Sequence, residues 1–338
     1  MRRHAASFMW ILTVCLCLSA CNLLPAGGSG NETSGSAASA PAGAGTDASA
    51  SGPVSTEEKA GSGSTAGETL SSVRERAALI GNRYGIRILC SSDARLSYSD
   101  YTASALTDPD QIRPALEVID RTLGIYPPGF FTSVREGFCD SITICLAKDL
   151  RAVNDSSHLE SAHAFTTVQD HTIWLVLNAG EPVLSSTLIH ELTHVTDYRL
   201  LAMHQLLESE WNRLNPQGFN YYNAYLDESG KDLRLTGSRR YTSEAETDPE
   251  EIWFYDAYSR TYAMEDRARL MEKLLEDVPE GDPQTQTDPL PDRDLCFASP
   301  HVRTKLRFYF YTLRQAFGTG RWPDQTSWEA ALQEAADQ

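Results

Sequence analysis

The sequence predicts an α+β fold in which a small mixed sheet with an edge strand lies beside one central helix, and a mainly helical part follows. Three observations support this prediction. Residues 141–147, 164–168 and 172–177 are apolar, β-prone runs. Residues 188–198 then have helical apolar spacing, and the longest segments after them are also helical in pattern. The helix over 188–198 carries the run His190-Glu191-Leu192-Thr193-His194.

Two helices are predicted ahead of the sheet. The first ends at Gly81 or Gly85, and a short strand over 86–90 follows it. Asp108-Pro109 begins the second helix, because Asp favours the cap and Pro the first turn, and Gly124 ends it.

The part after residues 190–194 is predicted to be mostly helical. The central helix is expected to continue to about Glu210, and 211–241, rich in Asn, Gly and Tyr, to form long loops over the site. Residues 250–277 and 302–317 are predicted helices, and the acidic, proline-bearing segment 278–294 links them.

The N-terminal residues 1–20 read as a secretory signal. Arg2 and Arg3 precede an apolar run, 8–18, that is too short for a permanent membrane helix. The run ends in Leu18-Ser19-Ala20-Cys21, which resembles a bacterial lipobox. The resemblance implies cleavage before Cys21, lipid attachment to this residue and anchoring to the membrane on its extracytoplasmic side.

The remaining chain divides into three parts by composition. Residues 21–70 are nearly all Gly, Ala, Ser, Thr and Pro, and we expect a flexible tether. Residues 71–180 are the helix and sheet part of the predicted catalytic domain, and 181–338 hold the central helix, a loop insert and the helical C-terminal part.

The net charge excludes one class of partner. The formal charge is −17, and removing Arg2 and Arg3, with no acidic residue in the first twenty, makes it −17 − 2 = −19. Such a surface repels nucleic acid.

Four of the seven cysteines remain after the signal and Cys21 are set aside: Cys90, Cys139, Cys145 and Cys296. They permit two disulfides in three connectivities, and buried reduced thiols are an equal alternative. A straight strand from Cys139 to Cys145 would hold these two residues too far apart to bridge, whereas a turn at Asp140-Ser141 would lift that restriction.

The spacing of His190 and His194 points to a metal. Residues four apart share one helix face, so both imidazoles can bind one Zn²⁺ while Glu191 stands beside it as a general base. A catalytic zinc site needs a third protein ligand. The metzincin extension would require Gly at 197 and His at 200, where the chain has Asp197 and Leu200, so that class is excluded.

The third ligand is predicted to be Glu265. In the run Tyr262-Ala263-Met264-Glu265-Asp266-Arg267-Ala268 the chain resembles the gluzincin peptidases, more closely their lethal-factor-like branch and zinc-binding lipoprotein peptidases with a Glu-Asp-x-Ala-Glu run. Together with residues 190–194 and Tyr258, the shared parts cover about a quarter of the chain. Arg269 departs from the pattern, which has a glutamate there.

The resemblance implies a role for each matching residue. His190, His194 and Glu265 would bind one zinc ion, Tyr258 would donate to the developing oxyanion, and Asp266 would orient a metal-bound imidazole. It also implies a zincin-like fold in which the strand before the motif helix lies at the sheet edge and receives the substrate. Residues 171–178 occupy that place in the sequence.

Each of these roles has rivals. Glu246, Glu250 and Glu251 are alternative ligands, and Tyr255 and Tyr262 share an aromatic stripe with Tyr258. Asp197 is expected to be structural, bonding within its helix or to Arg199. The remaining histidines have no metal spacing, and His171 alone is a candidate for substrate contact; they are His158, His163, His171, His204 and His301.

These patterns predict a membrane-anchored extracytoplasmic zinc metallopeptidase acting on peptides or proteins, with Glu191 as general base. Two alternatives stay open. One is a surface lipoprotein that keeps the fold to bind a partner without catalysis, and the other is a zinc amidase acting on cell-wall peptides. An intact Glu191 argues against the first, because a structural metal site needs no base between its ligands.

Overall fold

The computed structural model describes residues 69–153, 162–205, 207–224, 240–244, 246–276 and 292–337. The predicted signal peptide 1–20, Cys21 and nearly all of the tether 21–70 lie outside the described residues, as does His158. In the part of the chain that the structure describes, no helix has both the length and the apolar character needed to cross a membrane.

Most of the segments ahead of the central helix follow the sequence pattern, and two short helices were not predicted. Helix α1 (Leu70–Tyr84) ends at Gly85, whose φ of 72° lies in the left-handed region that glycine tolerates. Strand β1 (Arg87–Leu89) and the short helix η1 (Ser91–Asp93) follow. The Asp108 side chain caps α2 (Pro109–Leu123) by accepting from the Asp110 amide, and α3 (Phe130–Arg135) comes after it.

The sheet is mixed, with the order β1-β3-β5-β4 and β2 (Tyr101–Ala105) also paired to β3. Strand β3 (Ser141–Ala152) runs parallel to β1 and to β5 (Thr172–Asn178). Strand β4 (Ala164–Gln169) runs antiparallel to β5. The α+β prediction is therefore confirmed, including the mixed sheet and the mainly helical part after it.

Strand β4 is the edge strand on the β5 side of the sheet, and the assignment of residues 171–178 to the edge is wrong. Strand β5 lies between β3 and β4. Asp170 and His171 have φ of 52° and 55°, as the two central residues of a tight hairpin turn require, so β4 folds back along the outer side of β5. The apolar run of β5 is buried along almost its whole length, as expected of a strand covered on both faces.

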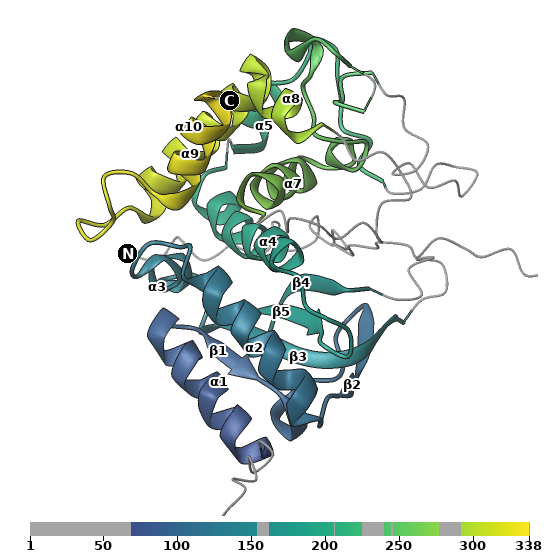
Figure 1. Ribbon diagram of the computed structural model, residues 1–338, viewed down its shortest axis with the longest axis vertical. Helices are drawn as coiled ribbons and strands as arrows, with labels where there is room; N and C mark the ends of the chain where they lie inside the picture. Colours follow the sequence, from purple (N-terminus) through teal and green to yellow (C-terminus); the bar gives the residue numbers. More distant parts are fainter. Residues whose placement is uncertain are drawn as a thin grey trace, which may run out of the picture. The chain divides into compact units, whose positions relative to one another are not determined.

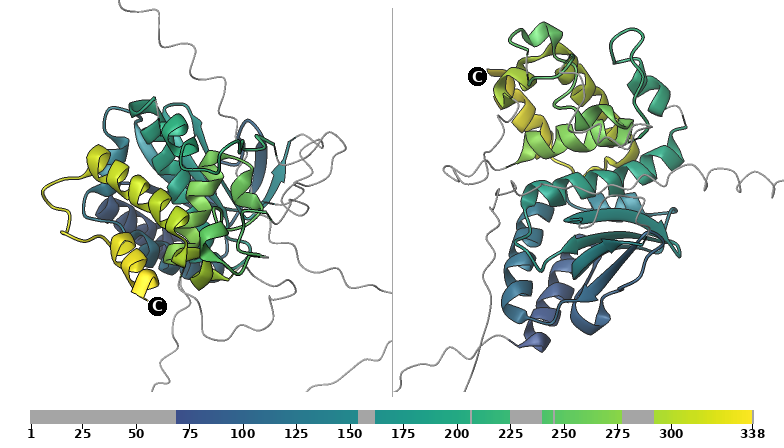
Figure 2. Two further views of the ribbon diagram at one scale, coloured as in Figure 1. Left: turned by 90° about the horizontal axis from the view of Figure 1, so that it is seen from above. Right: turned by 90° about the vertical axis from the view of Figure 1, so that its right-hand side faces the viewer.

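Helix α4 (Ser185–Met203) lies between the sheet and the helical part. Figure 1 and Figure 2 show it with β4 and β5 on one side and α7 on the other. It ends at Met203 rather than near Glu210, and a separate helix α5 (Leu207–Asn212) follows. Because α4 is covered from both sides, both its apolar and its polar side chains over 186–197 are buried.

The predicted helix over 250–277 is shorter than expected. Only its second half is helical, as α7 (Ala263–Leu275), and the first half holds the short turns η3 (Pro249–Glu251) and η4 (Tyr258–Arg260). The amides of Tyr222 and Asn223 donate to the carbonyls of Arg260 and Thr261, which an unbroken helix would use itself. The near-helical spacing of the aromatic residues here reflects packing, not a helix.

Two of the three C-terminal helices pack on α7, and the third packs on those two. Helix α9 (Pro300–Phe317) confirms the predicted amphipathic helix over 302–317, and α8 (Arg293–Ala298) and α10 (Ser327–Asp337) flank it. Most of the linker 278–294 and residues 225–239 of the predicted loop insert lie outside the described residues.

Candidate metal centre

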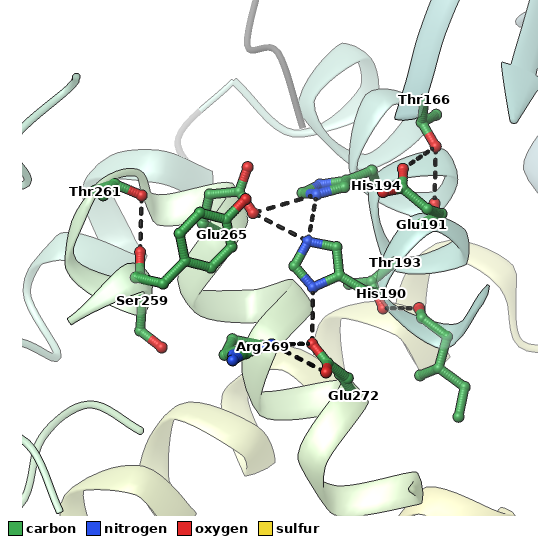
Figure 3. Close-up of polar contacts among 12 residues, drawn as sticks. Thr166, His190, Glu191, Thr193, His194, Ser259, Thr261, Glu265, Arg269 and Glu272 are labelled. Carbon is green, nitrogen blue, oxygen red and sulfur yellow. Dashed lines mark hydrogen bonds and ion pairs between the residues drawn. The ribbon is translucent and has the colours of Figure 1, made fainter. Parts of the chain in front are cut away.

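Helices α4 and α7 bring His190, His194 and Glu265 together (Figure 3). Oε2 of Glu265 lies 3.0 Å from Nε2 of His190 and 3.4 Å from Nε2 of His194. The two Nε2 atoms are 3.0 Å apart. All three side chains are buried, and the structure thus places the predicted ligand atoms in one compact cluster.

The cluster fits a zinc ion. Ligand atoms at about 2.0–2.1 Å from a tetrahedral zinc lie roughly 3.3 Å from one another. The three separations of 3.0, 3.0 and 3.4 Å are close to that value. Two imidazoles and one carboxylate are also the donor set of a His₂Glu zinc site. The rival ligands Glu246, Glu250 and Glu251 are not part of this cluster.

The Glu265 carboxylate is held in its charged form. Burial raises its pKa, but the neighbouring His194 and the polar contacts with both imidazoles outweigh burial and bring the pKa well below its ordinary value. An anionic oxygen at this position is what a divalent cation requires of its third ligand.

Glu191 is fixed through one oxygen only. The Thr166 hydroxyl, on edge strand β4, donates to Oε2 of Glu191 at 2.7 Å. Oε1 is buried and has no hydrogen-bond partner in the described part of the chain. Burial raises the pKa of this carboxyl, with His194, His190 and the Thr166 hydrogen bond opposing it. A carboxylate with one anchored and one open oxygen is suited to take up a proton.

The carboxylate that orients His190 is Glu272, not Asp266. Nδ1 of His190 donates to Oε2 of Glu272 at 3.0 Å, which leaves Nε2 as the atom facing the other ligands. Burial raises the pKa of Glu272, but Arg269 and the hydrogen bond from His190 bring it below its ordinary value. Glu272 follows Glu265 by seven residues, which is about two helical turns, so both lie on one face of α7.

Asp266 points away from the imidazoles, which corrects its predicted role. Its Oδ2 accepts from Lys305 Nζ at 2.8 Å, from the Tyr221 hydroxyl at 2.7 Å and from Trp211 Nε1 at 3.1 Å. Adjacent residues on a helix project about 100° apart, so Glu265 and Asp266 point in different directions. Asp266 therefore anchors α7 to α9 and to the loop after α5.

Tyr258 lies beside the cluster on the turn η4. Its ring is nearly parallel to that of His190, with centroids 6.0 Å apart and an interplanar angle of 26°. The Thr261 hydroxyl donates to the Tyr258 carbonyl at 2.7 Å and fixes the turn. Of its rivals, Tyr255 packs against Phe297 in the core.

The other candidate residues have separate partners. Asp197 accepts from Arg267 at 2.6 Å and from the Tyr309 hydroxyl at 2.9 Å, so it is structural as predicted, although Arg199 is not its partner. His171 lies in the exposed turn between β4 and β5. His163 and His204 contact Glu181 and Glu210, and His301 stacks on Trp253.

The four cysteines of the described part are unpaired, so the reduced alternative is the one the structure supports. Cys90, Cys145 and Cys296 are buried, and Cys139 is half-buried. Strand β3 begins at Ser141, after a bend at Asp140, so Cys139 lies outside the strand and the condition of one straight strand from Cys139 to Cys145 is not met.

Sequence comparisons find little. No family model matches the chain, and no curated protein matches it. A crystal structure of a protein from Bacteroides caccae, provisionally described as a zinc-binding metallo-peptidase, is similar with a TM-score of 0.43 and 11% sequence identity. The similarity covers 79% of this chain and 92% of that chain. At this level it carries no conclusion about the chemistry here, which has to be inferred from the site.

Three residues at the site were not predicted from the sequence: Thr166, Arg269 and Glu272. The spacing of seven residues between Glu265 and Glu272 was a usable signal, because it places both on one helix face. No sequence signal pointed to Thr166, because its contact with Glu191 depends on β4, rather than β5, being the edge strand beside the motif helix.

Proposed function

We propose that this chain is a membrane-anchored, extracytoplasmic zinc metallopeptidase of the gluzincin type that hydrolyses peptide bonds in peptides or proteins. One Zn²⁺ would be held by His190, His194 and Glu265. The observation that carries the proposal is the buried cluster of these three side chains beside Glu191, whose Oε1 has no hydrogen-bond partner among the described residues.

Zinc, when bound, supplies a Lewis acid that polarises a carbonyl and makes water more acidic. The Nδ1–H bond from His190 to Glu272 fixes the ring so that Nε2 faces the other two ligands. Oε1 of Glu191 takes the proton of the attacking water, while Oε2 stays on the Thr166 hydroxyl. Glu191 then returns the proton to the departing amine, and the Tyr258 hydroxyl donates to the oxyanion.

The substrate would add to the edge strand β4. Its backbone pairs with β5 on one side only, and Thr166 places the middle of β4 next to Glu191. An extended peptide can pair with such an edge through main-chain hydrogen bonds. The chemistry would then act on a bond near the middle of the paired segment.

The location outside the cytoplasm rests on the sequence. Residues 1–20 and the lipobox-like run ending at Cys21 support export and lipid attachment, and the spacer 21–70 would separate the folded part from the membrane. The net charge of −17 disfavours nucleic acid as a partner.

The variant Glu191→Gln tests the proposal. It keeps the Thr166 contact within reach but removes the proton acceptor, so hydrolysis of a denatured protein should fall by about 10²–10⁴-fold while zinc content stays the same. Glu117→Gln on α2, which removes an exposed carboxylate, is the matched control.

Hydrolysis unchanged by Glu191→Gln would contradict the peptidase proposal and favour a partner-binding role. Parallel digestion of purified cell wall by the wild-type protein separates an amidase from a peptidase. Release of wall peptides without cleavage of unfolded protein would replace the proposed substrate class.

A further inference from the structure

Arg269 contacts two carboxylates that belong to different parts of the site. Its Nη1 lies 3.0 and 2.9 Å from the two carboxylate oxygens of Glu272, and its Nε donates to Oδ2 of Asp256 at 2.7 Å. Glu272 in turn accepts from Nδ1 of His190 at 3.0 Å. A continuous chain of polar contacts thus runs from Asp256 through Arg269 and Glu272 to His190; Figure 3 shows its Arg269 to His190 part.

Asp256 sets the turn on which Tyr258 lies. Its Oδ1 accepts from the amide of Ser259 at 2.9 Å and from the Ser259 hydroxyl at 3.1 Å. The Arg269 guanidinium also lies 5.8 Å from the centroid of the Tyr258 ring. The arginine that holds Glu272 thus contacts both the carboxylate that fixes this turn and the Tyr258 ring.

We propose that Arg269 is a positioning residue that couples the orientation of His190 to the placement of Tyr258. The inference rests on the proposed function, because it gives the arginine a part in a metal centre with a tyrosine donor. Arg269 acts through Glu272 on one side and through Asp256 on the other. These two carboxylates, rather than a direct contact with substrate, would carry its effect on the site.

An arginine suits this place by its shape. The guanidinium is a planar fork whose Nε and Nη atoms donate in different directions, so it can hold two carboxylates in a fixed geometry. The Glu272, Asp256 and Arg269 side chains are 6%, 10% and 24% exposed, which limits screening by water. The neighbouring Lys273 lies 3.2 Å from Glu272, and its other ion pair is with Glu276 at 2.7 Å.

The difference between Arg269 and Lys273 provides the test. Both side chains give Glu272 a positive neighbour. Of the two, Arg269 is the one that also forms an ion pair with Asp256. Zinc affinity is measured by competition with a chelator on the full chain without its signal, and kcat and KM are measured on an unfolded protein substrate. Circular dichroism and thermal unfolding check each variant for folding.

Arg269→Gln should weaken zinc binding by about 10–100-fold, the range typical of outer residues that orient a ligand, and should also lower kcat. Lys273→Gln should change both by less than about threefold. Tyr258→Phe should lower kcat with zinc affinity unchanged. In the Arg269→Gln background, adding Glu272→Gln or Tyr258→Phe should cost clearly less than either does alone, because coupled residues are not additive.

Asp256→Asn gives a second variant if Arg269→Gln does not fold. It should lower kcat and leave zinc affinity within about twofold, since Glu272 keeps its contact with Arg269. Unchanged zinc affinity in folded Arg269→Gln, or equal effects of Arg269→Gln and Lys273→Gln, would overturn the inference. A wild-type chain that binds no zinc, or that does not need Glu191, would instead overturn the proposed function.

Discussion

The sheet and the helix α7 are built on opposite principles, although α4 packs against both. Side chains on one face of β3, such as Ile142, Ile144 and Leu146, lie in the apolar core below α4. Helix α7, on the other side of α4, buries four charged residues within about two helical turns: Glu265, Asp266, Arg267 and Glu272. Apolar burial suffices for the sheet, whereas α7 buries charge that needs partners.

The partners of these charges show what the difference achieves. Glu265 meets the two imidazoles, Arg267 meets Asp197 on α4, and Asp266 meets Lys305 on α9. Each of these contacts fixes one side of α7 against a neighbouring helix. The rotation of α7 that presents Glu265 to His190 is therefore set by charged contacts as well as by apolar packing. Buried pairs add little net stability, but losing one partner is expensive.

The largest expected effect on stability comes from Lys305→Met. It leaves Asp266 charged and buried without its cation, which should cost about 3–5 kcal/mol in the free energy of unfolding. Burial lowers the pKa of Lys305 and raises that of Asp266, so neither charge is stable there without the other. Urea unfolding of the variant and the wild type measures the loss.

The double variant Lys305→Met with Asp266→Asn is the control for that measurement. It removes both charges and keeps an oxygen for the Tyr221 and Trp211 donors, so most of the stability should return. A single variant that costs less than about 1 kcal/mol would mean that α7 does not depend on paired charge.

Thr166→Val probes the polar side chain that the sheet contributes to the site. Valine keeps the shape but removes the hydroxyl that donates to Glu191, a contact worth about 1.5–3 kcal/mol when the acceptor is charged. We expect kcat to fall by about 10–100-fold with KM little changed. Thr166→Ser should restore most of the rate, and a Val variant with wild-type kcat would exclude this role.

Ile144→Val should have the smallest effect and tests the apolar side of the comparison. Ile144 is fully buried between β1 and β5, so removing one methylene should cost about 0.5–1.5 kcal/mol. Zinc affinity and kcat should not change, because the sheet core supports the site without touching it. Weakened zinc binding in this variant would show that the two regions are coupled more closely than their packing suggests.

Much of the fold follows from local sequence patterns. The caps at Asp108 and Gly85 and the apolar runs of the three main strands locate their elements to within a few residues, because turn chemistry and hydrophobic spacing are local. The order of strands is not local. The fully apolar run of β5 was the sign that this strand is interior, since an edge strand seldom needs cover on both faces.

The site was predictable where one helix carries it. His190, Glu191 and His194 share a helical turn, so their relation is fixed by the sequence. The neighbours of Glu265 could not be predicted in the same way. The rotation of α7 about its axis decides whether Asp266 or Glu272 faces His190, and ion pairs with α4 and α9 set that rotation. Arg269, the departure from the family pattern, lies between the two real neighbours of the site, Asp256 and Glu272.

The most direct test of the metal centre is the zinc stoichiometry of the purified chain and of its Glu265→Ala variant. The wild-type protein should bind one zinc ion per chain, and the variant should bind zinc more than about 100-fold more weakly. This loss of affinity exceeds the one expected when a residue that only orients a ligand is replaced. A wild-type chain without zinc affinity, or a Glu265→Ala variant that binds zinc as tightly as the wild type, would contradict the assignment of these three ligands.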